Sequence, residues 1–284
     1  MSHAAHEITV EPVRLRRWPV PSHRVTARLV RRVMADPSVL TLLFQPILSL
    51  ETARIVGFEA LARLTTDLEH APVAMFRRAH ALGVGAELEA LAVRQALDIA
   101  ASANLAPDVF LSVNVSPLVV DHPALWEVLR SRDLRYLVLE LTEDDAVDDY
   151  PALRRAMRRY LARGARFAID DAGAGFASMR HLTELWPTFF KLDALLTHRL
   201  GRDERRQALV RALAMLATDV GATLIVEGVE GTNDLMHLCK TGLPIFVQGY
   251  AIARPGVPWA QISPAAGRTL AAVSRERPSR LLQT

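Results

Sequence analysis

The sequence predicts an α/β fold, a (β/α)8 TIM-like barrel whose first strand is antiparallel to its neighbour. Three observations support this prediction. Short, nearly continuous apolar segments recur along the chain, as expected of strands that are buried on both faces. Stretches rich in Ala, Leu and Arg, with helical spacing, lie between most of these segments. The alternating pattern extends over about 210 residues, and about 250 residues is typical of such a barrel.

The predicted elements follow one another along the whole pattern. Strands are predicted over 42–47, 55–61, 109–115, 136–142, 166–171, 189–193, 222–228 and 245–250. Helices are predicted over 87–103, 150–163 and 204–219, where apolar residues recur with a helical period. The link between the first two strands, "LSLETAR", is too short for a crossover helix, so we expect an antiparallel hairpin. A doubly wound open sheet is the alternative arrangement of these elements.

Length and composition are those of a globular protein with ample core. The 284 residues suit one large domain or two small ones, and we assign 24–262 to the barrel, 1–23 to an N-terminal arm and 263–284 to a C-terminal tail. The net charge of +3 is too close to balance to indicate a nucleic acid polymer as partner. The sequence contains no apolar run of about 18 residues, which is the length that would indicate a membrane span. With a single cysteine and no apolar signal-peptide core, the chain is expected in the cytoplasm.

Polar residues fall almost always at the downstream ends of the predicted strands. These residues are Glu59, Asn114, Glu140, Glu143, Asp170, Asp171, Lys191, Asp193, Glu227 and Gln248. In a barrel the carboxyl ends of the parallel strands meet at one mouth, where catalytic groups gather. One acidic residue at a strand end is usually a loop cap, but polar residues at seven strand ends indicate a common site.

Such a cluster of carboxylates requires cations. Ionised carboxylates that are crowded together repel one another and lose hydration, so they take up protons unless positive charge lies between them. Carboxylate and amide oxygens are ligands of Mg²⁺ and Mn²⁺, and the sequence has no set of His and Cys residues that suggests zinc. Two such ions about 3.5–4 Å apart are the usual device for in-line displacement at phosphorus. The sequence therefore predicts a two-metal site that acts on a phosphate ester.

The chain uses arginine as its ordinary cation, so each lysine is informative. Only two of its 34 basic residues are lysines, Lys191 and Lys240. An ammonium group is compact, has three donors and has a pKa that its surroundings can shift, which suits it to orient or deprotonate a water molecule. The alternative is that Lys191 merely forms a surface ion pair with Asp193.

A series of short motifs follows the predicted strands in order. The motifs are "FQPI" (44–47), "FEALAR" (58–63), "LSVNVSP" (111–117), "LELTE" (139–143), "IDDAGAGFASM" (169–179), "KLD" (191–193), "VEGVE" (226–230) and "QGY" (248–250). This series resembles the EAL-type cyclic di-GMP phosphodiesterases, in which Glu-Ala-Leu ends a barrel strand. The resemblance covers about residues 24–262. It implies hydrolysis of cyclic di-GMP to linear pGpG with two Mg²⁺ or Mn²⁺ ions, inhibition by Ca²⁺, and a homodimer. The regulatory partner is not identified by the sequence.

The resemblance also implies roles for individual residues. It assigns metal binding to Glu59, Asn114, Glu140, Asp170 and Asp171. It assigns catalysis, through the attacking water or the phosphate, to Lys191, Glu227 and Gln248. It assigns substrate contacts to Gln45, Arg63 and Asp193, and a guanidinium such as that of Arg63 can fork onto a phosphate. The anchor of the glycine-rich loop is assigned to Glu143, Gly173 and Gly175, because glycine permits a sharp turn after the metal ligands.

The glycine-rich loop departs from the family pattern. Alanine stands at 172, 174 and 177, where the family usually has a Phe and two hydroxyl-bearing residues. His80 stands where a glutamate is common, and Ile245 where an aspartate is common. None of these positions is a predicted metal ligand, so the departures concern regulation and dimer coupling more than chemistry. The alternative function is a catalytically silent EAL domain that binds cyclic di-GMP or another protein.

Overall fold

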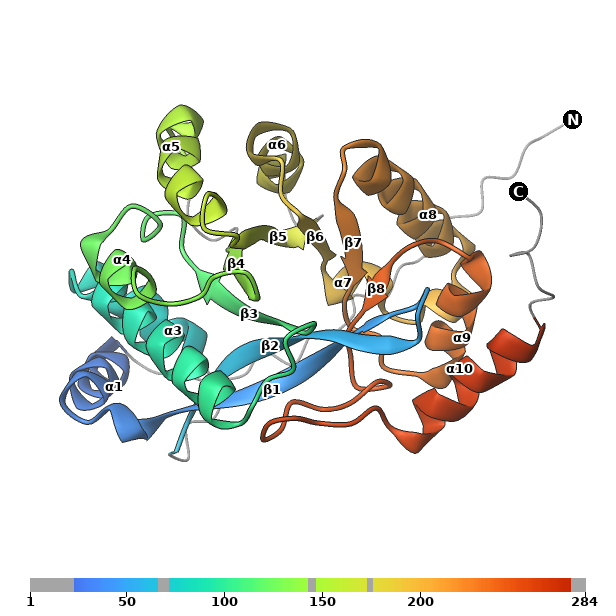
Figure 1. The fold of residues 1–284 in the computed structure, drawn as a ribbon, viewed down its shortest axis with the longest axis horizontal. Coiled ribbons are helices and arrows are strands. Elements are labelled where there is room, and N and C mark those ends of the chain that lie inside the picture. The colour runs from blue at the N-terminus through green and yellow to red at the C-terminus, as the bar shows by residue number, and fades with distance from the viewer. Residues whose placement is uncertain (1–22, 66–71, 143–146, 173–175, 277–284) are drawn as a thin grey trace, which may run out of the picture.

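The computed structural model describes residues 23–65, 72–142, 147–172 and 176–276. Within these residues a closed barrel of eight strands runs in chain order and is surrounded by helices (Figure 1). The strands are β1 (Leu40–Ser49), β2 (Arg54–Leu64), β3 (Phe110–Val115), β4 (Leu137–Leu141), β5 (Arg166–Ala172), β6 (Phe189–Leu192), β7 (Thr223–Val226) and β8 (Phe246–Val247). The closed order confirms the predicted barrel and excludes the doubly wound open sheet.

Most of the helices lie between strands in the sequence, the first precedes β1 and the last follows β8, and the helices surround the barrel (Figure 1). They are α1 (His23–Ala35), α2 (Pro72–Ala81), α3 (Gly85–Ser102), α4 (Pro123–Leu129), α5 (Tyr150–Leu161), α6 (Phe176–Leu185), α7 (Ala194–Thr197), α8 (Glu204–Asp219), α9 (Thr232–Thr241) and α10 (Pro264–Glu276), with 3-10 turns at Pro37–Val39 and Leu200–Arg202. Aspartate caps explain two of the starts. The side chain of Asp149 accepts from the Ala152 amide before α5, and that of Asp203 accepts from the first amides of α8.

The first strand pair is the predicted antiparallel hairpin. β1 pairs antiparallel with β2 in a register that places Gln45 opposite Glu59, and it closes the barrel by pairing antiparallel with β8. The other neighbouring strands are parallel. A connection of only a few residues permits a hairpin but no crossover helix, which is the physical reason for this exception.

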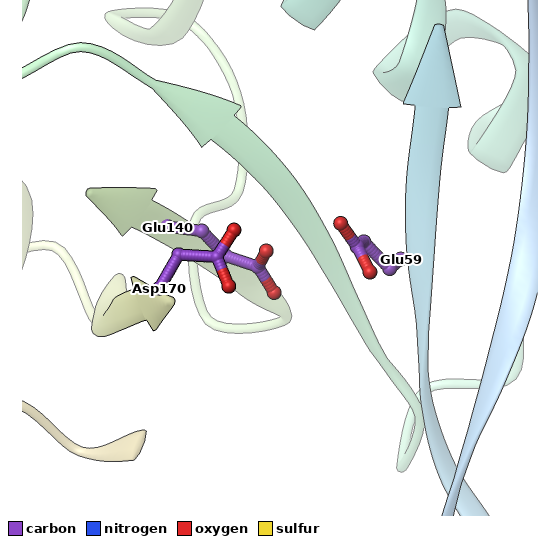
Figure 2. Close-up of side chains that lie close together, drawn as sticks. All are labelled: Glu59, Glu140 and Asp170. Atoms are coloured by element: carbon purple, nitrogen blue, oxygen red, sulfur yellow. The ribbon is translucent and has the colours of Figure 1, made fainter. Parts of the chain in front are cut away.

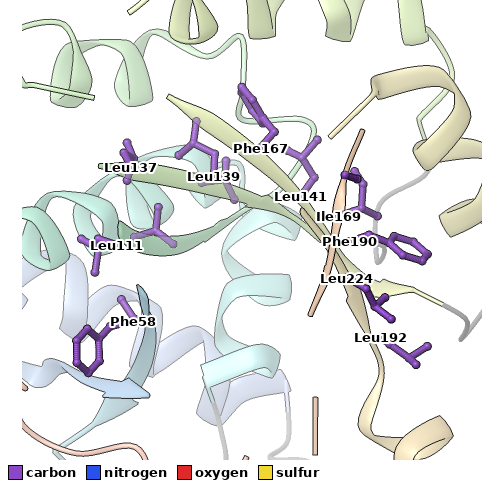
Figure 3. Close-up of a cluster of buried hydrophobic side chains, with 14 of the residues drawn as sticks. Phe58, Leu111, Leu137, Leu139, Leu141, Phe167, Ile169, Phe190, Leu192 and Leu224 are labelled. Carbon is purple, nitrogen blue, oxygen red and sulfur yellow. The ribbon is translucent and has the colours of Figure 1, made fainter. Parts of the chain in front are cut away.

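Alternation along the strands divides the core into two parts. Outward-facing side chains such as Phe167, Ile169 and Phe190 pack beneath the helices (Figure 3). The inward-facing residues Phe110, Ala168 and Phe189 belong to a separate apolar cluster inside the barrel, on the side of the amino ends of the parallel strands. Successive residues of a strand point to opposite faces, so the next inward residues after this cluster lie nearer the carboxyl ends. Those positions carry the polar residues of the site.

The stretch predicted as a C-terminal tail contains a packed helix. α10 begins at Pro264 and packs against α9. Its residues Ala266, Leu270 and Val273 are buried in the main core, and their spacing is that of one helix face. The small and polar composition of the stretch concealed this apolar face. Among the described helices, none is both long and apolar enough to cross a membrane.

Candidate active site

Lys191 lies at the centre of the polar end of the barrel. It extends inward from β6 and is only 1% exposed. Its Nζ lies 2.7 Å from Oε1 of Glu227, 2.8 Å from Oε2 of Glu140, 2.9 Å from Oδ1 of Asp170 and 3.5 Å from Oε2 of Glu59. The ion pair with Asp193 is not what the structure contains, because the side chain of Asp193 caps α7 by accepting from the Leu195 amide. Lys191 is therefore a buried member of the site.

Three of these carboxylates could hold a metal ion. Single oxygens of Glu59, Glu140 and Asp170 all lie within 4.8 Å of one another. Figure 2 shows Glu59, from β2, facing Glu140 and Asp170, from β4 and β5, across the inside of the barrel. An all-oxygen donor set of this charge fits a hard divalent cation such as Mg²⁺ or Mn²⁺.

Amide groups hold Glu59 in place. The Nδ2 of Asn114 donates to Oε1 of Glu59 at 3.0 Å, and the Nε2 of Gln248 donates to Oε2 at 2.6 Å. The same Gln248 nitrogen lies 3.1 Å from Oε1 of Gln45, whose own Nε2 donates to the carbonyl of Ala253. Both oxygens of Glu59 thus have a donor, and the network connects β2 to β1, β3 and the segment after β8.

The electrostatics of the site reflect an excess of negative charge. Burial raises the pKa of Glu140 well above its usual range, and the charges of Glu59 and Asp170 raise it further against the opposing effect of Lys191. Burial likewise raises the pKa of Glu227 to about 8. Burial alone would lower the pKa of the Lys191 ammonium, but the surrounding carboxylates hold it well above its usual range. One ammonium cannot balance four carboxylates, so an additional cation would be favoured here.

A cavity of about 320 Å³ opens onto these groups. Its lining includes Gln45, Glu59, Leu61, Asp170, Lys191, Ala194, Glu227, Gly228, Glu230, Gln248, Gly249 and Tyr250. Two glycines shape its wall. A Cβ on Gly228, which has a φ of +63°, would lie 2.5 Å from the Ala194 Cβ, and one on Gly249 would lie 2.4 Å from the Val229 backbone nitrogen. Glycine at 228 lets the loop after β7 approach α7, and glycine at 249 lets the loop after β8 approach the loop after β7.

The structure brings most of the predicted residues together. Glu59, Asn114, Glu140, Asp170, Lys191, Glu227, Gln248 and Gln45 form one connected group. Arg63 and Asp193 are not among the residues that line the cavity, and Arg63 donates to the carbonyl of Ala62 at 2.7 Å. Glu143, Gly173 and Gly175 lie outside the described residues, as does the side chain of Asp171.

Sequence reasoning missed Ser112. This residue is fully buried, and its hydroxyl donates to Oε1 of Glu140. Because its side chain is uncharged and it lies in the middle of an apolar run, it did not stand out among the polar strand ends. The available signal was its position two residues before Asn114 on the same strand, which places both side chains on one face. The lining residues Leu61, Glu230 and Tyr250 were missed as well.

The fold and the site together define a TIM-like barrel with an acidic, lysine-centred site at the carboxyl ends of its strands. The chain belongs to the EAL domain family, whose model matches residues 31–255. It is 32% identical over 249 residues to an uncharacterized signaling protein of Caulobacter vibrioides, a match that covers 83% of this chain and 30% of the relative. It is 30% identical over 231 residues to a cyclic di-GMP phosphodiesterase of Pseudomonas aeruginosa, covering 76% of this chain and 38% of that protein. The chain thus spans about a third of the length of these curated relatives.

Solved structures share the fold. The PaMucR phosphodiesterase in complex with c-di-GMP superposes with a TM-score of 0.71 at 24% identity, covering 82% of this chain and 98% of that one. The YkuI protein of Bacillus subtilis, in complex with c-di-GMP and calcium, superposes with a TM-score of 0.68 at 21% identity, covering 87% of this chain and 63% of that one. These likenesses confirm the barrel architecture.

Proposed function

We propose that this chain hydrolyses one phosphodiester of cyclic di-GMP to give linear pGpG, with Mg²⁺ or Mn²⁺ as the metal. The observation that carries the proposal is the convergence of Glu59, Glu140, Asp170 and Glu227 on Lys191 beside an open cavity. A phosphodiester is itself an anion, so a site this acidic can accept it only together with cations. Membership of the EAL family and the relative named as a cyclic di-GMP phosphodiesterase support the choice of substrate.

The proposed metal ligands are Glu59, Glu140 and Asp170, joined by Asn114 and Asp171. Divalent ions held there would offset the charge of the phosphate and lower the pKa of a bound water. The amides of Asn114 and Gln248 keep the Glu59 carboxylate oriented toward the other two carboxylates. The two-ion arrangement expected for the family needs ligands beyond the group of three, and Asp171 and Glu227 are the candidates.

Lys191 and Glu227 are the groups that we propose for handling the attacking water. Both line the cavity, and the Lys191 Nζ and Glu227 Oε1 atoms lie 2.7 Å apart, close enough to share a proton or to hold one water molecule between them and the substrate. An ammonium with three donors can orient this water while remaining paired with carboxylates. Gln248 also lines the cavity and would hold the water or the phosphate.

Gln45, Arg63 and Asp193 are proposed to contact the substrate. Gln45 already lines the cavity. The Arg63 guanidinium donates to a backbone carbonyl, so binding a phosphate would require it to turn toward the cavity. Such a movement is within reach of a long, flexible side chain and would add a bidentate contact.

A homodimer in the cytoplasm is the proposed state of the protein. Large apolar residues lie exposed on α8, among them Leu209, Met215 and Leu216, and a second copy of the chain would cover them. A cytoplasmic location is supported by the single cysteine, which can form no internal disulfide.

Turnover of cyclic di-GMP, followed by nucleotide chromatography, tests the proposed function. We expect the purified chain to form pGpG in Mg²⁺ or Mn²⁺ and to form none in Ca²⁺, because that larger, loosely coordinated ion would bind without organising the attack. If the chain binds cyclic di-GMP but leaves it intact with each of the three metal ions, the chain is a silent binding domain. Absence of both binding and turnover would refute the choice of substrate.

A further inference from the structure

Ser112 donates its hydroxyl to Glu140 from the neighbouring strand. It lies on β3, between β2 and β4, and its register partner on β2 is Glu59. Its exposed fraction is 0%, and so is that of Glu140. The hydroxyl of Ser112 donates to Oε1 of Glu140, while the Lys191 ammonium donates to Oε2 at 2.8 Å. The carboxylate of Glu140 is therefore held at both oxygens by protein donors.

Hydrogen bonds to both oxygens restrict rotation of the Glu140 carboxylate. A carboxylate with a free oxygen rotates about its last bond and presents its lone pairs in many directions. With one oxygen held from β3 and the other from β6, the plane of the Glu140 carboxylate is fixed. Glu59 is held in the same way, by Asn114 and Gln248, but those partners are amides that sequence reasoning had already placed in the site.

Partners behind metal ligands commonly decide how well a metal site works. They fix the orientation of the ligand, and their loss typically costs about 10- to 100-fold in metal affinity or activity. Glu140 depends on protein donors for this support because water does not reach it. A buried serine that only filled space would leave its hydroxyl without a partner, which is unfavourable, whereas this hydroxyl points at the ligand.

We infer that Ser112 is a positioning residue, which sets the orientation of the Glu140 carboxylate and thereby strengthens binding of the divalent cation. The inference rests on the proposed metal site. It assigns to the hydroxyl no contact with substrate and no part in proton transfer. Its loss should weaken metal binding and leave binding of cyclic di-GMP at saturating metal unchanged.

The test measures Mn²⁺ binding by the whole chain in the absence of nucleotide, from the electron paramagnetic resonance signal of free Mn²⁺. Two variants remove the strong donor. Ser112→Ala deletes the hydroxyl. Ser112→Cys nearly keeps the side-chain volume but replaces the hydroxyl with a weak S–H donor. The matched control is Ser49→Ala, at another buried strand serine, whose hydroxyl accepts from the Thr52 amide in the β1–β2 hairpin.

We expect both Ser112 variants to bind Mn²⁺ about tenfold or more weakly than the parent, and Ser49→Ala to bind it like the parent. The Mn²⁺ concentration needed for half-maximal turnover should rise by the same factor, with KM for cyclic di-GMP at saturating Mn²⁺ unchanged. Parent-like Mn²⁺ affinity in both folded variants would overturn the inference and leave the proposed function standing. Failure of the parent to bind Mn²⁺ would overturn the metal site and the inference together.

Discussion

The identity of a single cation distinguishes this site from an ordinary ion-pair cluster. In a chain where all but two basic residues are arginine, the buried centre of the site is Lys191. Its Nζ is shared among four carboxylates that come from four different strands or their ends. A guanidinium is planar and directs its donors as a fork, so it could not meet four groups around one point. The lysine that composition singled out is thus explained by geometry.

Lys191→Arg should lose most of kcat while retaining affinity for cyclic di-GMP, measured in Ca²⁺ to prevent turnover. The charge survives in this variant, but the compact point donor facing the water does not. The control is Lys240→Arg, the same change on α9, which should be nearly neutral. Hydrolysis by Lys191→Arg at close to the parent rate would show that only a positive charge is needed there.

The residues of the site were predictable where they carry charge and close an apolar strand. Glu59, Glu140 and Asp170 could be placed at one mouth because parallel strands end together. The role of Ser112 was not predictable in the same way, because a small hydroxyl within an apolar run looks like any buried serine. Contacts of Arg63 also lay beyond prediction, since its guanidinium bonds to the backbone of its own strand.

At the scale of the elements, apolar runs located the strands but not where their pairing stops. The run 245–250 was predicted as a strand, yet β8 is only Phe246–Val247, and β7 ends at Val226, before Glu227. In both cases the next residue, Glu227 or Gln248, lines the cavity, and its backbone amide still donates to the neighbouring strand, to Leu192 of β6 or Val226 of β7. The backbone turn at Gly249 and its approach to Val229 are tertiary effects that hydrophobic pattern does not encode.

Packing of the apolar cluster inside the barrel depends on a close contact between the neighbouring strands β2 and β3. A Cβ on Gly57 of β2 would lie 2.2 Å from the ring of Phe110 on β3. That ring cannot move aside freely, because it stacks on Phe189 with a centroid separation of 5.0 Å. Glycine at this position therefore allows the aromatic layer to form across the barrel.

Gly57→Ala should destabilise the fold by about 1–3 kcal/mol, as overpacking of a close-packed core typically does. Urea denaturation of parent and variant measures the difference. Gly57→Ala combined with Phe110→Leu serves as the control, because the smaller side chain should recover part of the loss. A Gly57→Ala variant as stable as the parent would mean that the Phe110 ring relocates without cost.

At the scale of the whole molecule, the barrel interior has two ends with different chemistry. The part near the amino ends of the parallel strands is apolar and aromatic, and the part near their carboxyl ends holds the carboxylates, amides and lysine. The alternating apolar and helical segments were sufficient to predict the barrel, and the short link between the first two strands was sufficient to predict that the first strand is antiparallel. Assembly was not predictable from pattern alone, since an exposed apolar residue on one helix looks the same in a monomer and in a dimer.

Met215→Glu should convert the proposed homodimer to a monomer. Met215 on α8 is 62% exposed, so a charge there costs a monomer little but would be buried and unpaired in a dimer interface. Light scattering after size-exclusion chromatography measures the mass. Ser131→Glu, at an exposed loop position away from α8, is a control for the added charge itself. A parent chain that is monomeric, or a Met215→Glu variant that stays dimeric, would rule out this face as the interface.

The central claim is that the carboxylates at the mouth of the barrel form a metal-dependent phosphodiesterase site. The most direct measurement is the rate at which Glu59→Ala converts cyclic di-GMP to pGpG in saturating Mn²⁺, relative to the parent. We predict a loss of at least about 100-fold, in line with removal of a metal-held electrostatic contribution, and a fold that remains intact because Glu59 faces the cavity. Near-parent turnover by a folded Glu59→Ala variant would contradict the account.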